Sequence, residues 1–379
     1  MVPWGAPMVI GFDAKRAFQN LTGLGNYSRD ALRILARHHP EHRYHAYTPR
    51  PGTLPEGLAG RVSVHGPRTL LGRSLPSLWR TRGVVADLVA DGIEVYHGLS
   101  AELPIGIEDT RVAGVVTIHD LIFERAPDLY GAIDRRIYRA KTRSAVARAR
   151  RIVAITEETA GDVVRLYGAD RSRIRVVHPT CHPAFREPIP PEALEEVRRR
   201  HALPAGFVLA VGTLERRKNL MVVLRALVGL PGVPFVAVGR PTPYLDELRA
   251  FARTNGLDDR VRFLSGVSSA DVRAMYRLAT VAVYPSLLEG FGLPILEALA
   301  SGTPVVTSRG GCFEEAGGPA AAYVDPRDAD AVRSMLGAIL ADPDRRRLMI
   351  EAGLAHAEGF RDEVVAGKLV AVYREALAG

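Results

Sequence analysis

Short apolar runs alternate with longer amphipathic stretches along the whole chain. In the first half, these runs predict strands at residues 8–12, 43–48, 94–98, 112–118 and 151–156. In the second half, they predict strands at residues 207–213, 235–239, 261–266, 281–286, 304–308 and 321–325. Most of the segments between them have helical periodicity, for example residues 25–39 and 134–150. Strands that alternate with helices indicate largely parallel sheets in both halves.

A proline-rich stretch separates the two halves. Residues 178–191 contain five prolines, which neither a helix nor a central strand tolerates. The predicted fold is therefore α/β, with two doubly wound domains at residues 1–185 and 186–360. The amphipathic segment 361–379 can pack on either domain. Because ligands bind at the carboxyl ends of parallel strands, we expect a ligand cleft between the strand ends of the two domains.

Composition indicates a soluble globular protein. The chain is 47% apolar and 24% charged, with a mean hydropathy of +0.02, and no apolar run approaches 18 residues. Its start has no basic region followed by an apolar core, so no secretory signal is expected. Cys181 and Cys312 lack metal-ligand spacing and are predicted to be free thiols. The expected location is the cytoplasm.

The net charge of +8 is concentrated in the first half of the chain. Residues 1–190 hold 27 Lys and Arg against 19 Asp and Glu, whereas residues 191–379 hold 23 of each. Two interpretations remain open: arginine-rich solvated helices, or peripheral contact with anionic lipid at the inner face of the cell membrane. The basic run at residues 135–151 has one aromatic residue and no nucleic-acid motif, so no nucleic-acid partner is expected.

The stretch EGFGLPILE places Glu289 and Glu297 between a predicted strand and a predicted helix. Pro294 suits a first helical position and Gly302 suits the residue after a helix end. A helix N-terminus at the edge of an α/β sheet binds anions, but carboxylates repel them. Hydroxyl groups are therefore the expected partners of the two glutamates.

A second motif, VGTLERRKNL, follows the first strand of the second half. Gly212 allows a close backbone approach, and Arg217 and Lys218 stand where a helix begins, although cations favour the other end. Either they face a multiply charged anion or they form a basic surface cluster.

Three further motifs are weaker. His119 and Asp120 follow a strand, where a hydrogen-bonded turn or a helix cap is the alternative to catalysis. Asp328 and Asp330 are predicted to begin a helix rather than to bind a metal. Gly23 and Gly25 match the dinucleotide fingerprint poorly.

Taken together, these motifs resemble family 4 glycosyltransferases, which are retaining, nucleotide-sugar-dependent enzymes of the GT-B fold. The resemblance rests on YPSLLEGFGLPILEALASGTPVVTS, GTLERRKNL, TIHDLIFERAPDLY, VYHGLSAELP, TGLGNY and FEEAGGPAAAYVDPRD, and covers nearly the whole chain. The first half is most similar to the branch that builds bacterial surface polysaccharides and includes mannosyltransferases.

The resemblance implies a role for each motif. Glu297 would bind ribose hydroxyls, Glu289 would contact the donor sugar, and the Arg217–Lys218 pair would bind the diphosphate. His119 would lie beside the donor sugar. The further donor-binding residues that it implies are Gly23, Gly25, Gly212, Thr213, Leu264, Phe291, Gly292 and Leu293.

The implied activity is transfer of a hexose, with mannose as the first candidate, from a nucleoside diphosphate sugar. The acceptor would be a hydroxyl of a glycan or lipid-linked molecule, the anomeric configuration would be retained, and neither a cofactor nor a metal would be required. Two alternatives stay open: an epimerase or hydrolase of nucleotide sugars on the same fold, and a nucleotide-dependent oxidoreductase or binding protein. Retention of NAD by the purified protein would favour the second alternative, and thermal protection by UDP or GDP would favour transfer.

Overall fold

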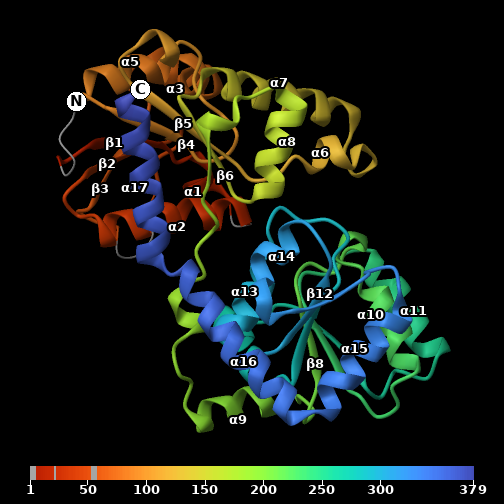
Figure 1. Ribbon diagram of the computed structural model, residues 1–379. Helices are drawn as coiled ribbons and strands as arrows, with labels where there is room; N and C mark the ends of the chain where they lie inside the picture. The colour runs from red at the N-terminus through yellow and green to blue at the C-terminus, as the bar shows by residue number, and fades with distance from the viewer. Residues whose placement is uncertain (1–5, 21–22, 53–57) are drawn as a thin grey trace. The chain divides into compact units, whose positions relative to one another are not determined.

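The structure, a computed structural model, describes residues 6–20, 23–52 and 58–379. The chain divides into two compact units (Figure 1). Unit 1 comprises Met1–Thr180 and Asp362–Gly379, and unit 2 comprises Cys181–Arg361. The first crossing between them falls within the proline-rich stretch, and the last helix of the chain belongs to unit 1. Among the described residues, none of the helices combines the length and the apolar character that a bilayer-spanning segment needs.

Unit 1 is built on a parallel sheet. Within the described residues, it has seven strands in the order β3-β2-β1-β4-β5-β6-β7. The direction of winding reverses between β1 and β4, so the switch point of the sheet lies at their carboxyl ends. The strands are β1 (Val9–Asp13), β2 (Arg43–Tyr47), β3 (Val62–His65), β4 (Val95–Gly98), β5 (Ala113–Ile118), β6 (Arg151–Ala154) and β7 (Ile174–Val176).

Helices cover both faces of this sheet. The α-helices are α1 (Lys15–Gln19), α2 (Gly23–His38), α3 (Leu70–Ser74), α4 (Pro76–Leu78), α5 (Val84–Ala90), α6 (Ile122–Arg125), α7 (Ala132–Arg148), α8 (Glu157–Tyr167) and α17 (Asp362–Ala378). Short turns of other helical types are η1 (Trp79–Gly83), η2 (Ile107–Asp109), η3 (Pro127–Leu129) and η4 (Arg171–Arg173).

The apolar sequence of the central strands follows from this two-sided cover. Every residue of β1 and β5 is buried, as expected for parallel strands packed on both faces. On one face, Leu32 and Leu35 of α2 pack with Val370 of α17, which lies beside α2 although it is far away in the sequence (Figure 1). On the other face, Leu88 of α5 and Val163 of α8 belong to a second apolar cluster.

Unit 2 has the same winding. Within the described residues, it has a parallel sheet of six strands in the order β10-β9-β8-β11-β12-β13, which reverses between β8 and β11. The strands are β8 (Val208–Val211), β9 (Phe235–Val238), β10 (Val261–Leu264), β11 (Val281–Tyr284), β12 (Val305–Ser308) and β13 (Ala322–Val324). The fold prediction, two doubly wound parallel sheets, is confirmed.

The α-helices of unit 2 are α9 (Pro191–Arg200), α10 (Leu220–Val228), α11 (Tyr244–Thr254), α12 (Ser269–Leu278), α13 (Leu293–Ala300), α14 (Cys312–Gly317), α15 (Ala329–Ala341) and α16 (Pro343–Ala357). Its 3-10 turns are η5 (Pro183–Phe185), η6 (Arg216–Lys218), η7 (Gly318–Ala320) and η8 (Glu358–Phe360).

Candidate active site

The loop after β8 begins the candidate site at the switch point of unit 2. Gly212 has φ +144°, and a Cβ at Gly239 would lie 1.8 Å from the Gly212 carbonyl oxygen. Both positions therefore require glycine, because the loops after β8 and β9 touch through their backbones. Thr213 follows, and its carbonyl accepts the Glu215 N–H at 2.9 Å.

The two predicted diphosphate ligands lie just before a helix rather than inside its first turn. Arg217 and Lys218 belong to the 3-10 turn η6, and Asn219, with φ +56°, separates them from α10. The Asn219 amide donates to the carbonyls of Pro285 (3.2 Å) and Pro326 (2.6 Å). These bonds hold Asn219 against the loops that follow β11 and β13. They favour the left-handed backbone of Asn219, which separates η6 from α10.

Arg217 and Lys218 both contact the carboxylate of Glu289, which the family resemblance assigns to the donor sugar. Glu289 Oε1 lies 2.6 Å from Lys218 Nζ, and Glu289 Oε2 lies 2.6 Å from Arg217 Nη1. Lys218 Nζ also donates to the Tyr284 hydroxyl at 2.6 Å, and Arg217 Nη2 lies 2.8 Å from Glu215. Three of the predicted residues thus form one cluster of ion pairs.

The charges in this cluster are strongly coupled. Burial by itself would raise the pKa of Glu289, but the charges of Lys218 and Arg217 hold that pKa below its usual value. Burial lowers the pKa of Lys218, and Glu289 opposes that effect. The pKa of Arg217 is raised because Glu289 outweighs its loss of hydration. An anionic ligand that reaches these cations therefore competes with the Glu289 carboxylate for them.

Glu297 has different surroundings. It lies one turn into α13, and its Oε2 accepts the hydroxyl of buried Tyr276 at 3.2 Å. Its carboxylate keeps some contact with solvent, yet the surrounding protein raises its pKa to about 7 through desolvation. No cation is among the groups that shift this pKa. A carboxylate of this kind gains from hydroxyl groups that donate hydrogen bonds to it.

The N-terminus of α13 lies between the two glutamates in sequence. Gly292 is the N-cap residue, and its φ is +108°. Because it is a glycine, it has no side chain that could accept hydrogen bonds from the N–H groups of the first turn. Phe291 is buried, Leu293 is the first helical residue and Pro294 is the second, one position later than predicted. Pro294 has no N–H, and the Ile295 N–H donates to the Gly292 carbonyl at 2.9 Å. In this turn, the Leu293 N–H is therefore the backbone group that could donate to a phosphate.

Leu264 ends β10 and lies away from the ion-pair cluster. Its carbonyl accepts the Gly239 N–H at 2.9 Å, and it lines a pocket of about 520 Å³ together with Leu214, Thr242 and Arg249. This pocket is the candidate place for a nucleotide base.

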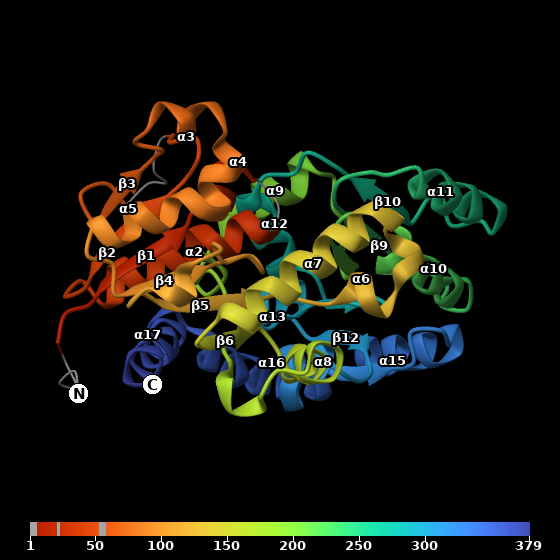
Figure 2. The ribbon, with the colours of Figure 1, turned by 90° about the horizontal axis from the view of Figure 1, so that it is seen from above.

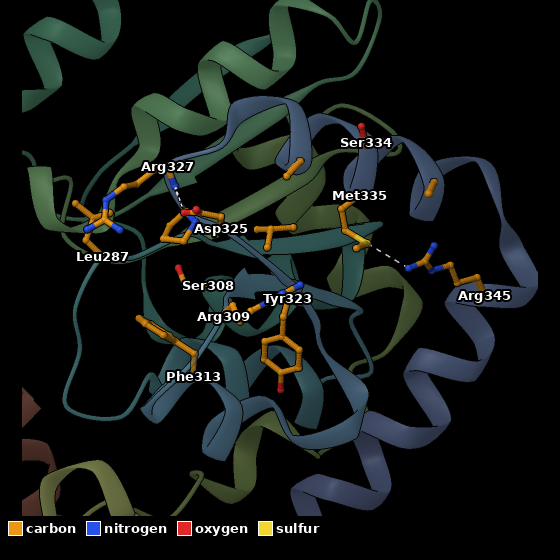
Figure 3. A pocket seen from close by; sticks show the side chains of 14 residues that line it. Leu287, Ser308, Arg309, Phe313, Tyr323, Asp325, Arg327, Ser334, Met335 and Arg345 are labelled. Carbon is orange, nitrogen blue, oxygen red and sulfur yellow. Dashed lines mark hydrogen bonds between the residues drawn. The ribbon is translucent and has the colours of Figure 1, made fainter. Parts of the chain in front are cut away.

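A larger pocket of unit 2, about 790 Å³, lies at the ends of β12 and β13 beside α15 (Figure 3). Among the described residues that line this pocket, none is a site residue predicted from the sequence. Its three arginines do not converge: Arg327 and Arg345 lie at opposite ends in Figure 3, and Arg345 donates to Met335 Sδ at 3.2 Å. We therefore do not assign an anion to it.

His119 is held by its neighbours in unit 1. Its Nε2 lies 2.8 Å from the Leu99 carbonyl, and the Tyr27 ring meets it edge-on with centroids 4.5 Å apart. Burial lowers the pKa of His119, so the ring is neutral, Nε2–H donates, and Nδ1 can accept from a ligand hydroxyl. Asp120 accepts the Ile122 N–H at 3.1 Å and caps the following turn.

A buried hydrogen-bond chain lies behind His119. Tyr27 bonds the Thr117 hydroxyl at 3.1 Å, Thr117 bonds His97 Nε2 at 2.8 Å, and His97 Nδ1 bonds the Tyr373 hydroxyl of α17 at 2.8 Å. This chain of hydrogen bonds was not predicted from the sequence, because its members come from four separate elements.

Gly23 and Gly25, which the resemblance implies bind the donor, lie in a helix. Both lie in the first turn of α2, after residues 21 and 22, which are outside the described chain. A Cβ at Gly25 would lie 1.8 Å from the Asn20 carbonyl oxygen, whereas Gly23 has open space around it. Gly25 is therefore needed for a close backbone approach.

The switch point of unit 1 holds a charged pocket that was not predicted from the sequence. Asp13, the last residue of β1, accepts two bonds from Arg80 Nε at 3.1 and 3.0 Å, and Arg80 also pairs with Glu102. Glu102 in turn lies 3.1 Å from Lys141. The pocket has a volume of about 230 Å³. An acidic residue directly after the first strand was the available signal.

Among the described residues, one group of side chains approaches metal-ligand spacing: His39, Glu41 and His42. His42 Nδ1 accepts the Met8 N–H at 3.3 Å, which leaves the ring proton on Nε2, the atom that faces Glu41 at 3.7 Å. The group also precedes β2, so it lies at the amino edge of the sheet of unit 1, whereas the switch point of that sheet lies at its carboxyl edge. Asp328 caps α15 through the N–H groups of residues 330 and 331, as predicted.

Solved structures with the same fold define the class of protein. Sucrose-phosphate synthase from Thermosynechococcus elongatus aligns with a TM-score of 0.78 and 21% identity over 98% of this chain and 99% of that one. An Anabaena protein, HepE, solved in complex with UDP and glucose, aligns with a TM-score of 0.75 and 18% identity over 96% and 98% of the two chains. The two doubly wound units are those of the GT-B fold of glycosyltransferases.

Sequence comparison then identifies the family. Residues 21–184 match Glycosyltransferase Family 4, and residues 194–356 match Glycosyl transferases group 1. O-antigen chain mannosyltransferase B of Escherichia coli is 30% identical over 286 residues, which is 74% of each chain. D-inositol 3-phosphate glycosyltransferase of Xylanimonas cellulosilytica is 36% identical over 246 residues, 61% of this chain and 58% of that one. The chain belongs to glycosyltransferase family 4.

Proposed function

We propose that this glycosyltransferase moves a hexose from a nucleoside diphosphate sugar to a hydroxyl of a glycan or lipid-linked acceptor, with retention at the anomeric carbon. Two similar proteins support a nucleoside diphosphate sugar as the donor. One relative is an O-antigen chain mannosyltransferase, and one structural neighbour was solved in complex with UDP and glucose. Mannose is the proposed sugar, and assembly of a surface polysaccharide is the proposed role.

The cluster of Arg217, Lys218 and Glu289 carries the proposal. It stands at the switch point of a parallel sheet, where such folds bind ligands. A bound diphosphate would replace Glu289 as the partner of the two cations. The released carboxylate could then accept hydroxyl groups of the donor sugar, while Glu297 accepts the ribose hydroxyls.

The transfer follows from this arrangement. The bond between the anomeric carbon and the diphosphate oxygen breaks, and the acceptor oxygen forms the new bond on the same face. The acceptor proton passes to the leaving diphosphate oxygen. Negative charge develops on the diphosphate as the bond breaks, and Arg217, Lys218 and the Leu293 N–H at the start of α13 would stabilise it.

We also propose that activity needs no divalent metal, because these fixed cations and backbone dipoles supply the charge that a metal would otherwise supply. Transfer assayed in excess EDTA should proceed at the rate of the untreated enzyme. Complete loss of activity in EDTA, restored by magnesium or manganese, would contradict this proposal.

The donor is tested by thermal unfolding in the presence of UDP, GDP and their sugars, followed by transfer assays with the donor that stabilises most. Nuclear magnetic resonance of the product reports its anomeric configuration. We expect Glu297→Ala mainly to weaken nucleotide binding and Glu289→Ala mainly to lower kcat. If both variants bound nucleotide and turned over like the parent, the assignment of this motif would be wrong.

A further inference from the structure

Four leucines within nine residues of unit 1 project into solvent. Leu70 is 80% exposed, Leu71 66%, Leu75 48% and Leu78 49%, and all four belong to the α3–α4 segment, residues 70–78. Scattered apolar residues on a surface need no explanation, but a contiguous group of this kind marks an interaction site.

The leucines are not needed to hold the segment in place. Trp79, only 4% exposed, anchors it from below, and its Nε1 donates to Asp87 at 2.7 Å. Gly72 is buried against the Trp79 ring, where an added Cβ would come within 3.2 Å. The fold therefore fastens the segment through Trp79 and leaves the leucines outside the core.

Two exposed arginines flank these leucines. Residues 57–86 contain five arginines and no acidic residue, but Arg80 pairs with Asp13 and Glu102. Arg73 and Arg82 are exposed, whereas Arg68 at the border of the segment pairs with Asp91. Aliphatic side chains flanked by arginines match an anionic lipid surface, into which leucines insert while guanidinium groups stay at the headgroups. Protein interfaces rely instead on aromatic anchors in packed pockets.

A second apolar stripe lies on α7, which is joined to η1 through a shared carboxylate. Ile133 (78% exposed) and Ile137 (44% exposed) are one turn apart on α7, and Lys141 continues the stripe by one more turn. Lys141 and Arg80 of η1 share the carboxylate of Glu102, so α7 borders the segment that carries the leucines. Figure 1 shows α3 and α7 at the top of the unit, and Figure 2 shows α4 next to α3.

We propose that the α3–α4 segment, together with the outer face of α7, docks this protein on a membrane surface that contains anionic lipid. Leucine insertion supplies the apolar part of the binding, and Arg73 and Arg82 supply the electrostatic part. The proposal goes beyond the transfer reaction and does not depend on the identity of the donor or acceptor.

Flotation of the full-length protein with vesicles tests this. The vesicles contain phosphatidylcholine alone or mixed with phosphatidylglycerol. Binding is expected to the mixed vesicles, to weaken as salt is raised, and to be weak for phosphatidylcholine alone. The double variant L70S/L71S should lose about tenfold in affinity for the mixed vesicles, because two inserting side chains are gone.

The matched control is L348S/L354S, which alters two exposed leucines of α16 in unit 2 (59% and 44% exposed). It should bind vesicles like the parent, and all variants should keep the parental unfolding transition. No binding by the parent would overturn the proposal, as would equal losses in the two variants or no loss in L70S/L71S. Light scattering that shows a parental dimer dissociated by L70S/L71S, without vesicle binding, would instead make this face an interface between copies.

Discussion

Replacement of Glu297 by glutamine should stabilise the protein without nucleotide and weaken nucleotide binding at the same time. The carboxyl sits in a desolvating environment beside the Tyr276 hydroxyl, and its pKa is raised to about 7. Above that pH the folded protein must hold a poorly solvated anion. Glutamine removes the anion and keeps an oxygen that can accept a hydrogen bond from Tyr276, so the folding penalty disappears together with the carboxylate that is proposed to bind the ribose.

The size of the effect follows from the pKa shift. The usual value for this carboxyl is 4.5, and the folded value is about 7. Each unit corresponds to about 1.4 kcal/mol, so the penalty at pH 8 is at most about 3 kcal/mol, and about 1–3 kcal/mol with allowance for residual solvent contact. Because folding raises the pKa, the native state binds the proton more tightly. Stability from this group is therefore lost as pH rises from 4.5 to about 7 and is constant above that.

Urea unfolding of the parent and of Glu297→Gln at pH 5 and pH 8 measures this penalty. The variant should be more stable at pH 8 by about 1–3 kcal/mol and only slightly different at pH 5. Glu192→Gln, an exposed carboxylate in the first turn of α9, should show no such difference and serves as the control. A variant that is equally or less stable than the parent at pH 8 would refute the desolvation argument.

Nucleotide binding has the opposite dependence on pH. If the ribose hydroxyls need the ionised form of Glu297, then nucleoside diphosphate affinity in the parent should fall about tenfold between pH 8 and pH 6. Calorimetric titration at the two values measures this change. In Glu297→Gln the affinity should be low at both values, and a parental affinity that does not vary with pH would refute the proposed role of the carboxylate.

Three further predictions concern the cations, the buried network and the glycines. Lys218→Ala should lower kcat at saturating donor by an amount equivalent to about 3 kcal/mol, by analogy with the loss of one oxyanion donor, and an unchanged kcat would contradict its role. Thr117→Val should destabilise the protein by about 2 kcal/mol in urea unfolding, because it removes the hydroxyl that joins two buried rings, whereas Thr117→Ser should have a small effect. Equal stability of the two would show that the network contributes little. Gly25→Ala should lower the free energy of unfolding by about 1–3 kcal/mol, because the added Cβ collides with the Asn20 carbonyl. Gly23→Ala has free space and should be neutral or stabilising. Similar melting temperatures for the two variants would contradict the close approach at Gly25.

The central strands could be recognised from the sequence because each is buried on both faces. Such strands are continuous apolar runs, and all of those predicted are present. The strands that were missed, β3 and β7, are the two edges of the sheet in unit 1. They have three or four residues each and polar side chains such as Ser63 and Arg175, because an edge strand is only partly covered.

The motifs of the candidate site were also visible in the sequence, since their residue types and their order along the chain carry the family resemblance. The pairing of Lys218 with Glu289 was not visible, because the two residues are 71 positions apart. They meet because β8 and β11 are neighbours at the switch point, a consequence of sheet order rather than of local sequence.

The sequence by itself therefore determined the fold class, and it predicted a proline-rich linker and the residue types of the candidate site, because all three depend on local pattern. Only the tertiary structure decided that α17 returns to unit 1, that Asp13 and Arg80 form a charged pocket, and that the leucines of α3 and α4 remain outside the core. The sequence alone does not distinguish a buried apolar residue from an exposed one. Its place is decided by which distant segments pack against it.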